Sequence, residues 1–397
     1  MTSRRLRGFV ALSALALGAS ACFGNVSLGG PGDASDDAGP TATQTLHDGG
    51  PAQTQTQTMT SDDADAGTDS GPPVKTTTSS SEAGTDSSPG TTTGTASTVF
   101  IDSTNGFHDG AVATDGTTLF WVQESLTEGG EDQLVTCPAT GCPSSGPSVF
   151  WTQANWGDGT GELALVDGRI YFQTQMNGPV VSCPTSGCGS APTQFVSVTN
   201  TQAFGAALVS DGTNLYWHDN DAIYACALGV SCASPSKLAT LPSGDYVSEL
   251  FADGTSVFWA DSTAATMSSV PVAGGAASIL CSVTGKTIDT IAVLGGYAYS
   301  TVAEGDSGNG SAIYRCPVTG GAATVYSSDS GAFNVATDGT NLYWLSYHDA
   351  GTLMRTCAPG ETCASPTTLF DVLYTLSFIV DGDALYSVSG KIRRTTL

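Results

Sequence analysis

The cysteines are the residues whose spacing most clearly indicates chemistry, and that chemistry is disulfide formation. Eight of the eleven form four tight pairs: Cys137 with Cys142, Cys183 with Cys188, Cys226 with Cys232, and Cys357 with Cys363. Each pair encloses Pro, Gly or Ser, which is typical of a hairpin turn across which two sulfurs can approach. A zinc knuckle is the alternative, but zinc sites usually use closer pairs and place two of them together. We therefore expect four hairpin disulfides.

The histidines offer little acid–base chemistry. His108, His218 and His348 each precede an aspartate, but the sequence has no Gly-x-Ser-x-Gly, His-Glu-x-x-His or phosphate-loop motif. His218 and Asp219 could form a base with its orienting partner. Two surface polar residues at the end of a strand are the simpler interpretation, so we assign no catalytic residue.

A repeat must position these side chains. A short apolar run, an Asp-Gly pair and two aromatic residues recur at pairs that begin at Asp115, Asp167, Asp211, Asp253, Gly295 (a Gly-Gly copy), Asp338 and Asp381. The first step is 52 residues and the others are 42 to 44. A period near this length indicates tandem structural units.

Each unit reads as four short antiparallel strands. Asp-Gly favours a two-residue hairpin, because both central positions need positive φ, and the flanking β-branched and aromatic residues suit strands. The cysteine pairs follow the third strand. We therefore predict an all-β, seven-bladed β-propeller of four-stranded blades, rather than six or eight blades or a solenoid. The last copy lacks a fourth strand, so we expect 97–103 to pair with 391–395 and close the ring.

Cys281 and Cys316 lie in neighbouring copies of the repeat. They can pair with each other across two blades, but the sequence leaves this open.

The aromatic pairs carry a family resemblance. Tyr216-Trp217-His218-Asp219 and Phe258-Trp259-Ala260-Asp261 resemble the YWTD repeats of low-density-lipoprotein-receptor-type propellers, and the chain is also similar to TolB-like propellers. Either resemblance implies a propeller with a binding role.

Acidic residues mark the predicted ligand face. The Asp-Gly and cysteine turns should share one face, and the more variable loops should share the other, where binding usually lies. Asp109, Glu162, Glu249 and Asp289 start the inner strands and could ring the channel on that second face. Such a ring could hold Ca²⁺ or attract a cationic partner. The alternative is an ordinary solvated acidic rim.

The N-terminus reads as an export signal. Arg4, Arg5 and Arg7 precede a short apolar stretch at 8–17, and Ala19-Ser20-Ala21-Cys22 resembles the lipobox of bacterial lipoproteins. The resemblance implies cleavage after residue 21, acylation of Cys22, and, because Phe23 replaces the family's Asp retention signal, the outer membrane. A signal peptide with a chance cysteine is the alternative.

Residues 22–97 read as a lipidated, disordered tether, followed by the propeller at 98–397. The tether is rich in Thr, Ser, Asp and Gly, with ten acidic residues and one basic residue, Lys75. It contains too few apolar residues to offset the entropy of ordering.

The overall charge limits the kinds of partner that the protein can bind. The 397 residues carry a net charge of −25, which argues against nucleic acid as a partner. We predict a monomeric, membrane-anchored binding or assembly module for an unknown protein, glycan or cation, with no required cofactor and Ca²⁺ as the candidate ion. The alternatives are an exported polysaccharide lyase or hydrolase, and a structural surface protein.

Overall fold

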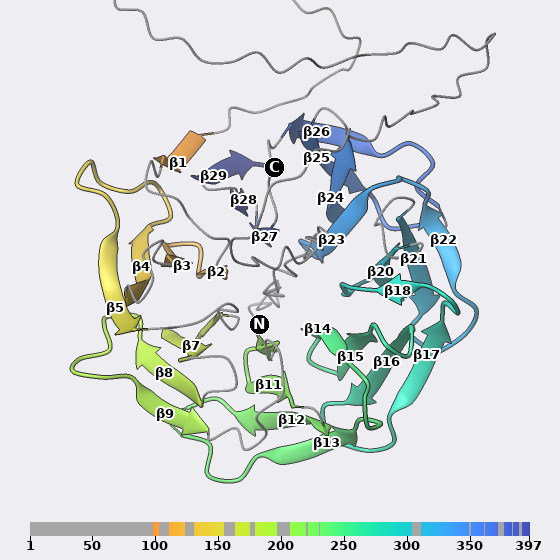
Figure 1. Cartoon of the computed structure of the whole chain (residues 1–397), viewed down its shortest axis with the longest axis horizontal. Helices are drawn as coiled ribbons and strands as arrows, with labels where there is room; N and C mark the ends of the chain where they lie inside the picture. Colours follow the sequence, from red (N-terminus) through yellow and green to blue (C-terminus); the bar gives the residue numbers. More distant parts are fainter. Residues whose placement is uncertain are drawn as a thin grey trace, which may run out of the picture. The chain divides into compact units, whose positions relative to one another are not determined.

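The computed structural model describes residues 98–102, 111–123, 131–154, 163–174, 179–196, 207–219, 221–229, 231–303, 311–348, 351–360, 362–371, 377–382, 384–388 and 391–397. These residues form seven antiparallel sheets arranged as the blades of a β-propeller (Figure 1). The predicted fold class and blade number are confirmed. The part of the chain that the structure describes contains no helix with the length and hydropathy of a membrane span.

Six blades follow the chain from the inner strand to the outer strand. Blade 1 comprises β2 (Val112–Thr114), β3 (Thr118–Gln123), β4 (Glu131–Pro138) and β5 (Ser148–Ala154). Blade 2 comprises β6 (Ala164–Val166), β7 (Arg169–Gln173), β8 (Val180–Pro184) and β9 (Thr193–Val196). Blade 3 comprises β10 (Val209–Ser210), β11 (Asn214–His218), β12 (Ala222–Ala227) and β13 (Ser236–Thr240).

The next three blades have the same order. Blade 4 comprises β14 (Val247–Ala252), β15 (Ser256–Asp261), β16 (Thr266–Pro271) and β17 (Ser278–Ser282). Blade 5 comprises β18 (Thr287–Ile288), β19 (Ala292–Leu294), β20 (Tyr297–Ala303), β21 (Ala312–Pro317) and β22 (Thr324–Ser327). Its inner strand is interrupted, so that β18 and β19 both pair with β20. Blade 6 comprises β23 (Ala332–Thr337), β24 (Leu342–His348), β25 (Gly351–Cys357) and β26 (Thr367–Asp371).

Blade 7 joins the two ends of the described chain. It comprises β27 (Ser377–Asp381), β28 (Ala384–Val388), β29 (Lys391–Thr396) and, as its fourth strand, β1 (Thr98–Asp102). The register pairs Asp102 with Lys391 and Ile101 with Ile392. The predicted closure of the ring is therefore confirmed.

The Asp-Gly turns differ from the prediction in most blades. Two-residue turns with both residues at positive φ occur at Asp167-Gly168 and Gly295-Gly296. In blade 1 the turn is longer, and only Gly116 has a positive φ. There the Asp115 carboxylate accepts hydrogen bonds from the backbone N–H groups of Thr117 and Thr118 at 2.8 and 2.7 Å. The side chain therefore takes over part of the turn's hydrogen bonding.

All ten cysteines of the blades form disulfides. The four predicted hairpin pairs are present. Cys281 of β17 also pairs with Cys316 of β21, which joins blades 4 and 5 covalently and settles the pairing that the sequence left open.

Candidate functional site

The chain's path gives the propeller two distinct faces. Because neighbouring strands run antiparallel, the turns after the first and third strands of each blade share one face, which we call the turn face. The loops after the second strands and the connections between blades share the opposite face, which we call the loop face. Glu249 and Asp289, the two described residues among the four predicted to bind a ligand, belong to the loop face.

The structure describes two of the four predicted rim residues, and these two differ in burial. Asp109 and Glu162 lie outside the described residues. Glu249 on β14 is only 2% exposed, and its Oε2 accepts a hydrogen bond from the Ile291 N–H of blade 5 at 2.9 Å. Asp289 is partly buried beside β19, and this burial raises the pKa of its carboxyl. Glu249 thus links two blades, whereas Asp289 is the member that retains exposure.

A carboxyl pair on blade 4 was not predicted. Asp261, at the end of β15, is 2% exposed and hydrogen-bonds with Asp245 from the connection before β14. Burial, together with the charge and hydrogen bond of Asp245, raises the pKa of Asp261 to about 6, although Asp261 also accepts the Ala264 N–H at 2.8 Å. Two carboxyls this close favour a shared proton. In the sequence, the sign of this pair was Asp261 itself, which closely follows the aromatic residues Phe258 and Trp259.

In the contacts that the structure shows, the Asp219 carboxylate does not orient His218 as a general base. The Nδ1 atom of buried His218 lies 3.3 Å from the backbone oxygen of Asp219. The Asp219 carboxylate instead accepts the N–H groups of Asp221 and Ala222, both at 2.9 Å. These contacts shape the loop between β11 and β12. Both residues are buried, so the expectation of surface polar residues is wrong.

Blade 6 contains a polar cluster that sequence reasoning missed. Asp329 accepts hydrogen bonds from the Trp344 Nε1–H at 2.9 Å and from the Ser346 hydroxyl at 2.8 Å. Ser346 Oγ lies 3.0 Å from Nε2 of His348, and Arg355 lies 3.7 Å from the carboxylate of Asp329. The Nη2 atom of Arg355 also lies 3.5 Å from Nε2 of His348. The members of this cluster come from β24, β25 and the connection before β23, so only tertiary packing reveals it.

This cluster is not a nucleophilic triad. In such a triad, the serine and the carboxylate contact opposite nitrogens of the imidazole. Here both lie on the Nε2 side, and Ser346 is 0% exposed. A buried hydroxyl bonded to a carboxylate cannot reach a substrate, so the arrangement orients His348 rather than activating Ser346.

No metal centre is visible among the described blade residues. That part of the chain has no group of three or more His, Cys, Asp or Glu side chains arranged to hold an ion. The Asp245–Asp261 pair supplies two carboxyls, fewer than the six to eight oxygen ligands that Ca²⁺ usually takes.

Comparison with known proteins supports the architecture. No protein-family model and no curated protein sequence matches the chain. Among solved structures, a Mycobacterium tuberculosis puromycin-hydrolyzing peptidase is 13% identical with a TM-score of 0.51, over 70% of this chain and 49% of that one. A prolyl endopeptidase is 15% identical with a TM-score of 0.50, over 70% and 44%. This chain thus spans about half the length of these peptidases.

A third structure is similar over nearly its whole length. The virginiamycin B lyase of Staphylococcus aureus is 10% identical with a TM-score of 0.49, over 72% of this chain and 94% of that one. At these identities the likeness concerns the fold alone. The seven-bladed β-propeller rests on the chain's own sheet topology, and the two peptidase structures resemble it in fold.

Proposed function

We propose that this protein is a lipid-anchored, extracytoplasmic binding module whose loop face recognises a positively charged ligand. The anchor is Cys22, and the predicted tether at 22–97 holds the propeller away from the outer membrane. Five disulfides support an oxidising compartment. The excess of 37 acidic over 12 basic residues favours a cationic ligand over nucleic acid.

The observation that carries this proposal is the Asp245–Asp261 pair on the loop face, in which Asp245 is partly exposed and Asp261 is buried. Burial and the nearby Asp245 carboxylate raise the pKa of Asp261, so a cation that reaches the partly exposed Asp245 relieves the repulsion between the two side chains. The partly buried Asp289 on the following blade extends the negative potential along the same face. The ligand class that fits is a cationic peptide segment. Ca²⁺ stays a separate prediction, because the pair alone supplies only two carboxyls.

The enzymatic alternative has less support from the described residues. An exported lyase or hydrolase needs an acid and a base that both reach substrate. The His348 cluster supplies one partly exposed imidazole, but its serine and carboxylate are buried. A purely structural surface protein, the third possibility, would show no specific ligand.

The test is binding by the full chain at pH 7 and low salt. We expect a lysine-rich peptide to bind and Asp245→Asn/Asp261→Asn to weaken it about tenfold or more. Asp167→Asn is the matched control, because it removes one exposed charge from the turn face while Asn tolerates the positive φ of 51°. Equal binding by all three proteins would refute the proposed face. A glycan array and a Ca²⁺ melting series would test the other ligand classes.

The anchor needs a separate experiment. We expect the wild-type protein to incorporate a radiolabelled fatty acid and to fractionate with the outer membrane. The Cys22→Ala variant should lose the label. Labelling that persists without Cys22 would contradict the lipoprotein assignment.

A further inference from the structure

The seams between blades repeat one packing arrangement. The second strand of every blade carries an aromatic residue at the same register position: Phe120, Tyr171, Tyr216, Phe258, Tyr299, Tyr343 and Tyr386. At six seams this aromatic shares a packed cluster with the turn after the third strand of the following blade. We call the surface that receives this turn the turn seat.

Hydrogen bonds show how a turn is held in its seat. The Tyr171 hydroxyl donates to the Gly229 carbonyl at 3.0 Å and accepts the Gly229 N–H at 3.2 Å. The Cys232 N–H also donates to the Phe195 carbonyl at 2.7 Å. Phe195 is a bulged residue on the outer strand of blade 2. The turn is thus recognised by a tyrosine hydroxyl and by an outer-strand carbonyl.

The same outer-strand position is used at two further seams. Leu280 and Tyr326 are the bulged residues of blades 4 and 5. Their carbonyls accept N–H groups from the following turns, from Gly321 at 2.9 Å and from Cys363 at 2.6 Å. The recognition is therefore a recurring feature and not a single contact.

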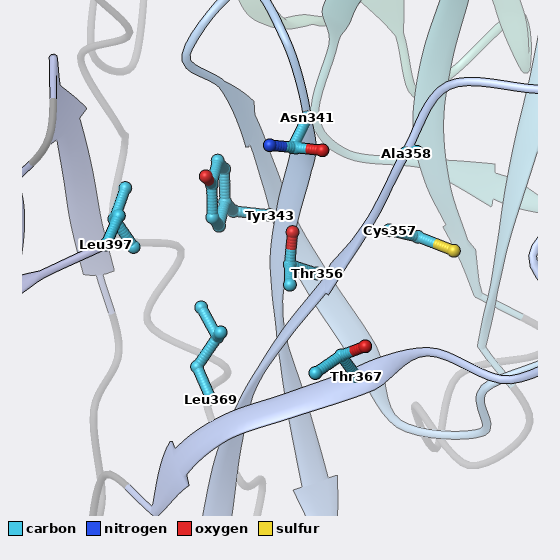
Figure 2. Close-up of a pocket in the computed structure, with 8 residues that line it drawn as sticks. All are labelled: Asn341, Tyr343, Thr356, Cys357, Ala358, Thr367, Leu369 and Leu397. Atoms are coloured by element: carbon cyan, nitrogen blue, oxygen red, sulfur yellow. The ribbon is translucent and has the colours of Figure 1, made fainter. Parts of the chain in front are cut away.

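The turn seat on blade 6 is the exception. The blade that follows it, blade 7, has no turn after its third strand. The fourth strand of blade 7 is β1, so no turn joins it to β29. A cavity of about 300 Å³ lies at this position (Figure 2). Its lining residues are Asn341, Tyr343, Thr356, Cys357, Ala358, Thr367, Leu369 and Leu397. Tyr343 is the seat tyrosine, and Leu369 is the bulged residue of blade 6.

We propose that this cavity on the turn face binds a tight turn from another protein, in the way that the other seats bind the turns of their own chain. The site lies on the face opposite to the cationic-ligand site and is independent of it. The cavity is of a size that can hold a compact peptide turn.

The hydrogen-bonding groups of the cavity specify the ligand further. The Tyr343 hydroxyl donates its proton to Asp338 at 2.9 Å, and its oxygen has the side chains of Asn341 and Thr356 as further hydrogen-bond partners. Leu369 offers the outer-strand carbonyl that elsewhere accepts an N–H group from the turn. A Gly-containing turn closed by a disulfide presents such an N–H group with little loss of entropy on binding.

A second copy of this chain is a poor source of that turn. Its third-strand turns in blades 1 to 6 already pack against their own preceding blades. Releasing one would break a seam, so the ligand belongs to a different polypeptide.

The test uses a disulfide-closed peptide with the sequence of residues 226–232, titrated into the full chain. We expect saturable binding with a dissociation constant below about 1 mM. Thr367→Trp should abolish binding because the exposed Thr367 borders the cavity, and Tyr343→Phe should weaken it about three- to tenfold. Tyr216→Phe is the matched control, since it loses the same kind of Tyr–Asp bond in a seat that Val272 of blade 4 already covers.

Three outcomes would overturn the proposal. One is the absence of saturable binding up to about 1 mM, and another is binding that Thr367→Trp leaves intact. The third is a concentration-dependent dimer that Thr367→Trp disrupts, which would assign the cavity to self-association. A peptide with Ser in place of both cysteines should bind more weakly, and equal binding would refute the preformed turn as the ligand class.

Discussion

The aspartates of the repeated turns act as local hydrogen-bond acceptors. One oxygen of Asp211 accepts the N–H groups of Thr213 and Asn214, both at 2.8 Å, and the other accepts the Tyr216 hydroxyl at 2.7 Å. Burial and the Asp211 carboxylate raise the pKa of Tyr216, which keeps this phenol protonated. The repeated Asp therefore stabilises the turns of blades 1, 3, 4 and 6 and is not itself evidence for a ligand.

Replacing this aspartate should reduce stability. We expect Asp211→Ala to lower the free energy of unfolding by about 1–3 kcal/mol, because two backbone donors and a buried hydroxyl lose their acceptor. Asp211→Asn should cost less, since an amide oxygen can still accept the N–H groups. Urea unfolding measures both. Equal effects of the two substitutions would contradict the assigned contacts.

The Asp245–Asp261 pair should make stability depend on pH. Because the folded-state pKa of Asp261 is raised to about 6 from 3.8, the native protein binds more protons than the unfolded chain between these values. This group therefore lowers stability as pH rises from about 4 to 6, by at most about 3 kcal/mol.

The variant Asp261→Asn isolates this contribution. Its stability relative to wild type should increase across that pH window and stay constant above pH 7. Thermal unfolding at several pH values checks this. A difference that does not change with pH would mean that Asp261 titrates at its ordinary value.

At the scale of the strands and turns, the disulfides divide into two kinds. The hairpin pairs close loops of five or six residues within one blade, whereas Cys281–Cys316 spans 35 residues and two blades. On the chain-entropy model, closing the longer loop adds about 4 kcal/mol to the free energy of unfolding, and closing a hairpin loop adds about 2 kcal/mol.

We therefore expect Cys281→Ala/Cys316→Ala to be the more destabilising double substitution. It should lower the free energy of unfolding by roughly twice as much as Cys183→Ala/Cys188→Ala. Guanidinium unfolding of both variants gives the comparison. A larger loss from the hairpin pair would show that the turn's fit on blade 1 outweighs loop closure.

The sequence predicts elements better than it predicts sites. The period, the Asp-Gly turns and the tight cysteine pairs are local signals, and they gave the blades and four disulfides correctly. Glu249 was placed at the start of an inner strand, but its bond to Ile291 depends on a register bulge between Val247 and Glu249. The cluster around Asp329 joins two strands and an inter-blade connection, so no local pattern reveals it.

At the scale of the whole molecule, stability depends on blade 7. Since β1 pairs with β29, the first described strand closes the ring. Removing it would leave β29 with an unpaired edge and open the circle of blades.

Two truncations should therefore behave differently. Removing residues 1–97 should leave the unfolding midpoint unchanged, because we place the propeller at 98–397. Removing residues 1–102 should lower the midpoint strongly and speed hydrogen exchange in β28 and β29. A similar midpoint for both truncations would show that β1 contributes little.

The pairing of β1 with β29 also sets an order of events during synthesis. The ribosome makes β1 before any blade exists, and the partner of β1 emerges only after six other sheets have been translated. Until then every nascent intermediate is an open arc with an exposed edge at each end, which is the kind of species that chaperones recognise. Pairing of the last strand with β1, after the proposed export, is therefore the step that closes the open arc into a ring.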